Sequence, residues 1–165
     1  MRAVIVGCGR VGAAMARTLE AGGHDVTIVD LVTRAFDRLP AAFRGNAVRG
    51  DGTDEDTLRR AGAEDADLFL SLTEGDNRNV MAAQLAAEAL GARKTVAKIN
   101  DPVRAEAYAH LGIASLCRTN LMMSAVLGAV GQAVPDRPGL YTPDVPHVHS
   151  PVGSADAAPA PTTEA

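Results

Sequence analysis

The sequence has no tryptophan, aromatic residues make up 3% of its 165 residues, and it contains two cysteines. So few aromatic rings argue against a surface on which nucleic-acid bases stack. A net charge of −4 also lacks the basic excess of surfaces that bind nucleic acid. Cys8 and Cys117 form no Cys-x-x-Cys motif and lie far apart in the sequence, so we expect no structural disulfide. The few aromatic rings and the missing basic excess together predict that the protein has no nucleic-acid partner.

Long apolar runs and a secretory leader are also missing. No apolar stretch approaches the ~20 residues that cross a bilayer, and the first strand begins almost at Met1, without a charged leader. These features predict a cytoplasmic protein. A hydrophobic content of 47% is enough for one domain with a buried core.

Short β-branched runs alternate with Ala-rich helical stretches, which is typical of βαβ units and a parallel sheet. The fold class is therefore α/β: a single domain with a Rossmann-like, doubly wound parallel sheet of six strands. The clearest helix is expected at 79–91, one near 33–43 should end or bend at Pro40, and Thr53 could cap the helix that follows it. The six strands are predicted at 3–7, 25–30, within 46–53 (a short strand and a turn), and at 66–73, 94–100 and 113–117.

Residues 119–134, "TNLMMSAVLGAVGQAV", predict a terminal helix with almost no polar face. Such a helix either packs into its own core or contacts a second subunit, and the adjacent methionines Met122 and Met123 favour an adaptable interface. The domain is thus placed at 1–134. Residues 135–165 are rich in Pro and Ala, with few large apolar side chains, and predict a disordered tail. His147 and His149 form a His-x-His pair without a third ligand, so no metal is expected.

A glycine-rich loop follows the first strand directly and opens a helix. Gly7, Gly9 and Gly12 fit the Gly-x-Gly-x-x-Gly pattern, in which the glycines permit a tight turn, backbone approach to a pyrophosphate and close helix–strand packing. The amides at the start of the helix would meet the phosphates. The predicted contributors from this loop are Gly7, Cys8, Gly9, Arg10, Val11 and Gly12.

Asp30 stands at the end of the second strand, where a carboxylate accepts hydrogen bonds from ribose hydroxyls and repels a 2′-phosphate. NAD(H) or an adenine nucleotide is therefore favoured over NADP, and Arg34 softens that preference. Ligands of doubly wound sheets bind beyond the carboxyl ends of the strands. Further site residues are expected there: Asp51, Gly52, Thr73, Glu74 and Lys98. Lys98 could instead be an edge charge that reaches solvent.

These segments resemble the nucleotide-binding N-terminal domain of Trk-type potassium uptake regulators, also called the regulator-of-potassium-conductance N-domain. The resemblance covers roughly residues 1–134 and is most specific in "GDGT", in the turn from Thr73 to Asn79, and in "INDP". It implies a cytosolic subunit that docks on a membrane potassium transporter or channel, binds NAD(H), or ATP and ADP in some relatives, and forms dimers or larger rings. The helix at 119–134 matches the region through which such domains pair.

The sequence departs from this family in three places. Members usually continue into a smaller C-terminal ligand-binding domain, whose functions we do not transfer because the Pro/Ala-rich segment stands there. "CRTN" lacks the proline common after the last strand, and Lys98 stands where arginine is frequent, so a bidentate phosphate contact is not expected.

The missing catalytic groups favour a sensor over an enzyme. A dehydrogenase needs an acid–base group beside its substrate. Here His24 lies in a turn, and Tyr108 has Gly112 instead of a lysine four residues later. The sequence thus predicts a nucleotide-sensing regulatory subunit of a potassium uptake system and no catalysis. Two alternatives stay open: a small oxidoreductase completed by a partner chain, and a scaffold that binds no ligand and pairs with a complete regulator.

Overall fold

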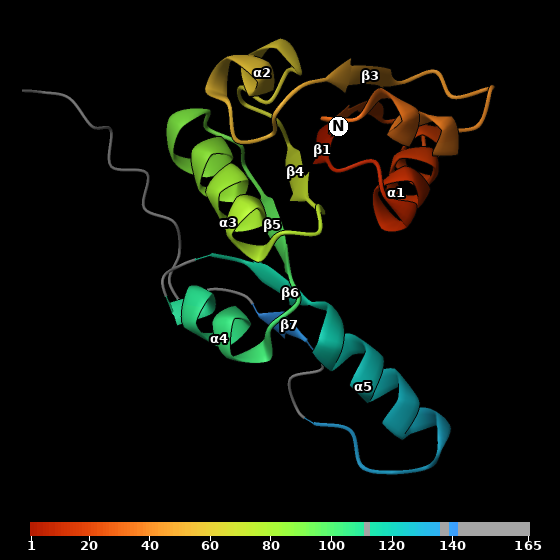
Figure 1. Ribbon diagram of the computed structural model, residues 1–165, viewed down its shortest axis with the longest axis vertical. Coiled ribbons are helices and arrows are strands. Elements are labelled where there is room, and N and C mark those ends of the chain that lie inside the picture. The colour runs from red at the N-terminus through yellow and green to blue at the C-terminus, as the bar shows by residue number, and fades with distance from the viewer. Residues whose placement is uncertain (111–112, 136–138, 142–165) are drawn as a thin grey trace, which may run out of the picture.

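The computed structural model describes residues 1–110, 113–135 and 139–141, and a single twisted sheet runs through the molecule (Figure 1). The strand order is β3-β2-β1-β4-β5-β6-β7, and all neighbouring pairs are parallel except β6 with β7. The strands are β1 (Arg2–Val6), β2 (Asp25–Asp30), β3 (Asn46–Arg49), β4 (Leu68–Ser71), β5 (Thr95–Ile99), β6 (Ser115–Cys117) and β7 (Leu140–Tyr141). The six predicted parallel strands are confirmed.

Helical segments connect the parallel strands. A π-helical turn extends α3, and a 3₁₀ helix forms the connection after β2. The segments are α1 (Arg10–Ala21), η1 (Thr33–Arg38), α2 (Glu55–Arg60), α3 (Asp76–Gln84), η2 (Leu85–Ala89), α4 (Pro102–His110) and α5 (Arg118–Ala129). α4 begins as expected, because the Asp101 side chain accepts hydrogen bonds from the amides of Val103 and Arg104.

Successive side chains of the central strands point to opposite faces of the sheet, so the core has a part on each face. In β1, Val4 packs with Phe69 of β4 and with α2 and α3, whereas Ile5 packs on the other face with α1 and η1. Small alanines such as Ala16 of α1 and Ala82 of α3 let the helices approach the sheet. A third cluster joins α3 and α4 to β5 and β6. Helices cover both faces, which is the doubly wound arrangement.

Three local features differ from the sequence-based prediction. Asp54, not Thr53, caps α2, because the Asp54 side chain accepts from the Thr57 amide at 3.0 Å. The segment after β2 is a short 3₁₀ helix. Part of the region predicted to be disordered forms β7, where the Gly139 carbonyl accepts from the Cys117 amide at 2.6 Å. The predicted tail from 142 onward, with His147 and His149, lies outside the described residues.

The terminal helix is shorter than predicted and stands away from the sheet. α5 ends at Ala129, before the expected limit of 134. It projects from the body of the domain (Figure 1). Ser124 is the buried residue of this helix, whereas Met122 and Val126 are 64% and 53% exposed. Packing of this helix into its own core is therefore not what the structure shows. No helix in the described part of the chain is long and apolar enough to cross a bilayer.

Candidate nucleotide-binding site

The candidate site lies where the sheet order reverses, between β1 and β4. From β1 the chain extends the sheet through β2 and β3, and it then returns to add β4 on the other side of β1. The loops after β1 and β4 consequently diverge to opposite faces and leave a crevice at the carboxyl ends of the strands. A cavity of about 970 Å³ occupies this position.

The glycine loop passes through this crevice under tight steric limits. Gly7 has φ +102°, and a Cβ there would come within 2.9 Å of the Thr73 amide nitrogen. A Cβ on Gly12 would overlap the Gly7 carbonyl oxygen, so this glycine permits the contact between α1 and the strand end. Gly9 precedes α1 directly, so the first N–H groups of α1 have no side-chain acceptor from the preceding residue. They supply donors and a positive helix end for an anion.

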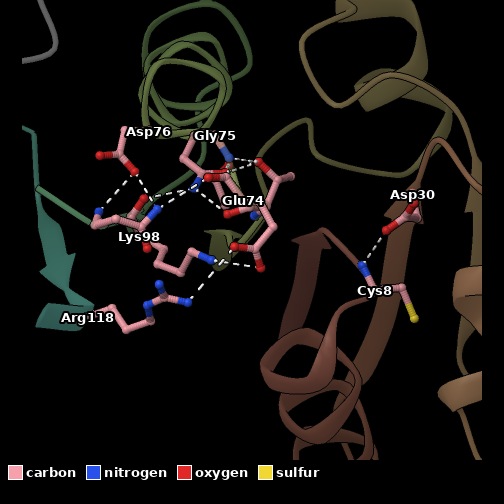
Figure 2. Close-up of polar contacts among 11 residues, drawn as sticks. Cys8, Asp30, Glu74, Gly75, Asp76, Lys98 and Arg118 are labelled. Carbon is pink, nitrogen blue, oxygen red and sulfur yellow. Dashed lines mark hydrogen bonds and ion pairs between the residues drawn. The ribbon is translucent and has the colours of Figure 1, made fainter. Parts of the chain in front are cut away.

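Asp30 fixes this loop against the end of β2. One carboxylate oxygen accepts from the Cys8 amide at 2.7 Å (Figure 2). The other accepts from the Val32 amide at 2.9 Å. Each carboxylate oxygen can accept a second hydrogen bond. Asp30 can therefore hold the loop and still accept from ribose hydroxyls.

Cys8 contributes its backbone to the site, and its thiol is buried. Burial raises the pKa of the Cys8 thiol, and the nearby Asp30 carboxylate raises it further, against a smaller opposing effect of Arg38. The thiol is therefore protonated near neutral pH and is a poor nucleophile.

The turn after β4 is built around buried Asn79. Its side-chain oxygen accepts from the Thr73 amide and hydroxyl at 2.9 and 2.6 Å, and its amide nitrogen donates to the carbonyls of Thr73 and Lys98. The Ser71 hydroxyl also donates to the side-chain oxygen of Asn79. One side chain thereby joins the ends of β4 and β5 and positions Thr73 at the crevice.

Glu74 and Lys98 form a pair at the edge of the site. Lys98 Nζ lies 3.5 Å from one Glu74 carboxylate oxygen, and Arg118 Nη1 lies 3.9 Å from the other. Lys98 is buried, so it is not an edge charge that reaches solvent. Asp76 accepts from the amides of Asn100 and Asp101 and thus fixes the loop after β5 beside this pair (Figure 2).

The structure gathers most of the predicted site residues around one cavity. The predicted residues that line it are Gly7, Cys8, Gly9, Arg10, Asp30, Asp51, Gly52, Thr73 and Glu74. Val11, Gly12 and Lys98 are not part of that lining. Val11 is exposed on α1, Gly12 is buried beneath the loop, and Lys98 is behind Glu74.

Sequence reasoning assigned no role to several cavity residues. Arg38 and Asp37 come from η1, and Arg78 comes from the first turn of α3. With Arg10 and Arg34, the lining holds four arginines, and Asp37 joins Asp30, Asp51 and Glu74 as four carboxylates, so the charges of the lining balance. The signal for Arg78 was its position in the first turn after a strand-end loop, where side chains face the crevice.

Among residues 1–110, 113–135 and 139–141, no group of three or more His, Cys, Asp or Glu side chains could hold a metal ion.

Comparison with known proteins identifies the family of the chain. The TrkA-N domain family matches residues 3–119. The potassium uptake protein TrkA of the Trk system from Streptomyces coelicolor is 49% identical over 113 residues, which are 68% of this chain and 51% of that protein. The TrkA homolog from Pyrococcus abyssi is 35% identical over 102 residues, 62% of this chain and 45% of the homolog. The chain thus spans about half the length of these relatives.

Solved structures show the same fold. The TrkA-N domain of the inner membrane protein YbaL from Escherichia coli superposes with a TM-score of 0.68 at 16% identity, covering 78% of this chain and 95% of that domain. The Kef CTD of Shewanella denitrificans in its AMP-bound form gives a TM-score of 0.63 at 25% identity, covering 81% and 84% of the two chains. Because the family match extends over well more than half of the sequence, this chain belongs to the TrkA-N domain family.

Proposed function

We propose that this chain is a nucleotide-sensing regulatory domain of a potassium uptake system, with NAD(H) as the preferred ligand and ATP or ADP as alternatives. The observation that carries the proposal is the cavity of about 970 Å³, lined by the glycine loop, Asp30 and Thr73. The names of the TrkA relatives supply the potassium uptake context, and the AMP-bound Kef CTD supports an adenine nucleotide.

The charges of the cavity support one ligand orientation. Anionic phosphates would lie at the start of α1, near Arg10, where the helix end is positive. The ribose would lie beside Asp30, whose carboxylate disfavours a 2′-phosphate. This orientation favours NAD(H) over NADP.

The chemistry of the lining favours sensing over catalysis. Among the described residues that line the cavity there is no histidine, tyrosine or lysine. Tyr108 packs against the core cluster of α4, β5 and β6 instead. The buried Cys8 thiol has a raised pKa, which disfavours a thiolate nucleophile. We therefore propose that the domain binds a nucleotide without turning it over.

A sensor needs a partner that reads its state, and the proposed partner is a membrane potassium transporter or channel subunit. We also propose that the domain forms homo-oligomers, as a dimer or a larger ring, through α5. The exposed apolar side chains of α5 support this, because an exposed apolar helix face in a small domain marks an interaction surface.

The test of nucleotide binding is isothermal titration calorimetry with NAD, NADH, AMP, ADP and ATP on the purified chain and on Asp30→Ala. A hydrogen bond to a charged group contributes about 1.5–3 kcal/mol, so Asp30→Ala should weaken binding by roughly 10- to 100-fold. Asp25→Ala is the matched control, because Asp25 stands at the opposite end of the same strand and is exposed. Its affinity should equal that of the wild type.

A thermal-shift assay provides the second measurement. A ligand at 100 times its dissociation constant should add about 2.7 kcal/mol of stability. Equal melting with and without all five nucleotides would contradict the sensor and support the ligand-free scaffold. Equal nucleotide affinity of the wild type and Asp30→Ala would contradict the proposal that Asp30 binds the ribose.

A further inference from the structure

Lys98 has an unusual environment for a charged side chain. The residue is 5% exposed, yet its counter-ion within 4.0 Å among the described residues is Glu74, whose side chain is 84% exposed. The Nζ–Oε1 distance of 3.5 Å is at the outer limit of a hydrogen bond. A buried charge needs a close partner, and an exposed carboxylate at this distance is a weak one.

Glu74 connects the cavity to two cations outside its lining. Glu74 is among the residues that line the cavity, whereas Lys98 and Arg118 are not. Figure 2 shows Lys98 and Arg118 converging on the Glu74 carboxylate from β5 and from the start of α5. A ligand phosphate that approaches from the cavity would therefore meet the Glu74 carboxylate before it meets either cation.

We propose that Glu74 is a displaceable internal carboxylate that sets the charge selectivity of the cavity and links its occupancy to the start of α5. The inference rests on the nucleotide binding proposed above. A ligand anion near Thr73 repels the Glu74 carboxylate and competes with it for Lys98 and Arg118. Nucleotides with more phosphate charge near Thr73 are repelled more strongly by the Glu74 carboxylate, so they bind more weakly while Glu74 is in place.

Displacement of Glu74 would act on α5 through Arg118, its first residue. The Arg118–Glu74 pair is lost when Glu74 moves, whereas the Thr119 hydroxyl still donates to the Asn100 carbonyl at 2.6 Å. The helix would thus keep one attachment and lose another. The change is confined to the first turn of α5, next to the apolar residues that we propose as the interface.

The proposed charge selectivity is tested with Glu74→Gln, which keeps the shape of the side chain and removes its charge. Glu106→Gln is the matched control, since it makes the same change in net charge at an exposed position on α4. Calorimetry of wild type and both variants would use AMP, ADP and ATP. Glu74→Gln should tighten ATP binding by roughly tenfold and should tighten AMP binding much less, because the removed repulsion grows with ligand charge.

The link to α5 is tested by amide hydrogen exchange over residues 118–129 with and without saturating ATP. Exchange of the amides at 122–124, whose hydrogen bonds close the first turn, should rise with ATP in the wild type and in Glu106→Gln. Glu74→Gln should show no ATP-dependent change there, because its ion pair is already absent.

The possible results separate the two proposals. If the wild type binds AMP, ADP and ATP but Glu74→Gln alters all three affinities equally, or only as much as Glu106→Gln, charge selectivity by Glu74 is wrong. Unchanged exchange in α5 of the ATP-bound wild type overturns the link to that helix. If no nucleotide binds the wild type, the proposed function itself fails, and this inference fails with it.

Discussion

At the scale of single residues, the glycine loop makes a sharp distinction between folding and binding. Gly12 has no room for a side chain, since a Cβ would overlap the Gly7 carbonyl oxygen. Gly9 has nothing within 4 Å of the position of a Cβ, and its φ of −78° suits any residue. The two glycines of one motif therefore serve different purposes.

We predict that Gly12→Ala destabilises the fold by about 3 kcal/mol, because a methyl group forced against backbone must displace α1 or the loop. Gly9→Ala should melt like the wild type but bind nucleotide more weakly, because its methyl group faces the cavity. Urea unfolding and calorimetry of both variants check this. Equal stability of Gly12→Ala and Gly9→Ala would contradict the packing role of Gly12.

Residue roles could be predicted from the sequence where a motif fixes the backbone. The glycine loop and Asp30 line the cavity because a strand, a turn and a helix follow each other at fixed spacing, and their contacts with a nucleotide stay a prediction. The burial of Lys98 could not be foreseen, because it depends on how Glu74 and β5 pack together. The central position of Asn79 likewise depends on contacts between β4 and β5 that no local pattern reports.

At the scale of elements, the sequence predicts the long strands and helices better than the short elements. All six parallel strands follow from short β-branched runs, whereas β7 is two residues long and lies in a Pro-rich region without periodicity. The π-helical turn η2 after α3 also leaves no sequence signal, because its composition is as helical as that of α3. Short elements that depend on tertiary pairing are not visible in local patterns.

The exposed face of α5 leads to a prediction about association. Met122 and Val126 are four residues apart and thus lie on one side of the helix. Met122→Glu with Val126→Glu should weaken self-association by at least about 100-fold, because two charges would be buried at the proposed interface. Sedimentation velocity over a range of concentrations measures this.

Val103→Glu provides the control for that experiment. Val103 is a 77% exposed apolar residue on α4, so it carries the same substitution away from α5. Its sedimentation should match that of the wild type. If the double variant associates as the wild type does, or if Val103→Glu disrupts association equally, α5 is not the interface.

At the scale of the whole molecule, the sheet consists of two halves that meet at the crevice. β1, β2 and β3 hold the glycine loop and Asp30, and β4 to β7 hold Thr73, Glu74 and Lys98. The cavity is lined by residues from both halves, so a ligand in it would contact both, and Asn79 joins the ends of β4 and β5. Nucleotide affinity should therefore depend on this buried side chain, which is absent from the cavity lining.

Asn79→Leu tests that dependence, since leucine has a similar size but cannot hydrogen-bond. The variant leaves the Thr73 amide and the Lys98 carbonyl without their Asn79 partner, so we predict a loss of about 2–4 kcal/mol in the free energy of unfolding. Nucleotide binding should weaken as well, because Thr73 and Glu74 lose their fixed positions. Asn77→Leu, at an exposed position in the same helix, should change neither quantity appreciably. Urea unfolding and calorimetry at a temperature where Asn79→Leu is folded distinguish the effects: full affinity in the folded variant would show that Asn79 stabilises the sheet without positioning the site.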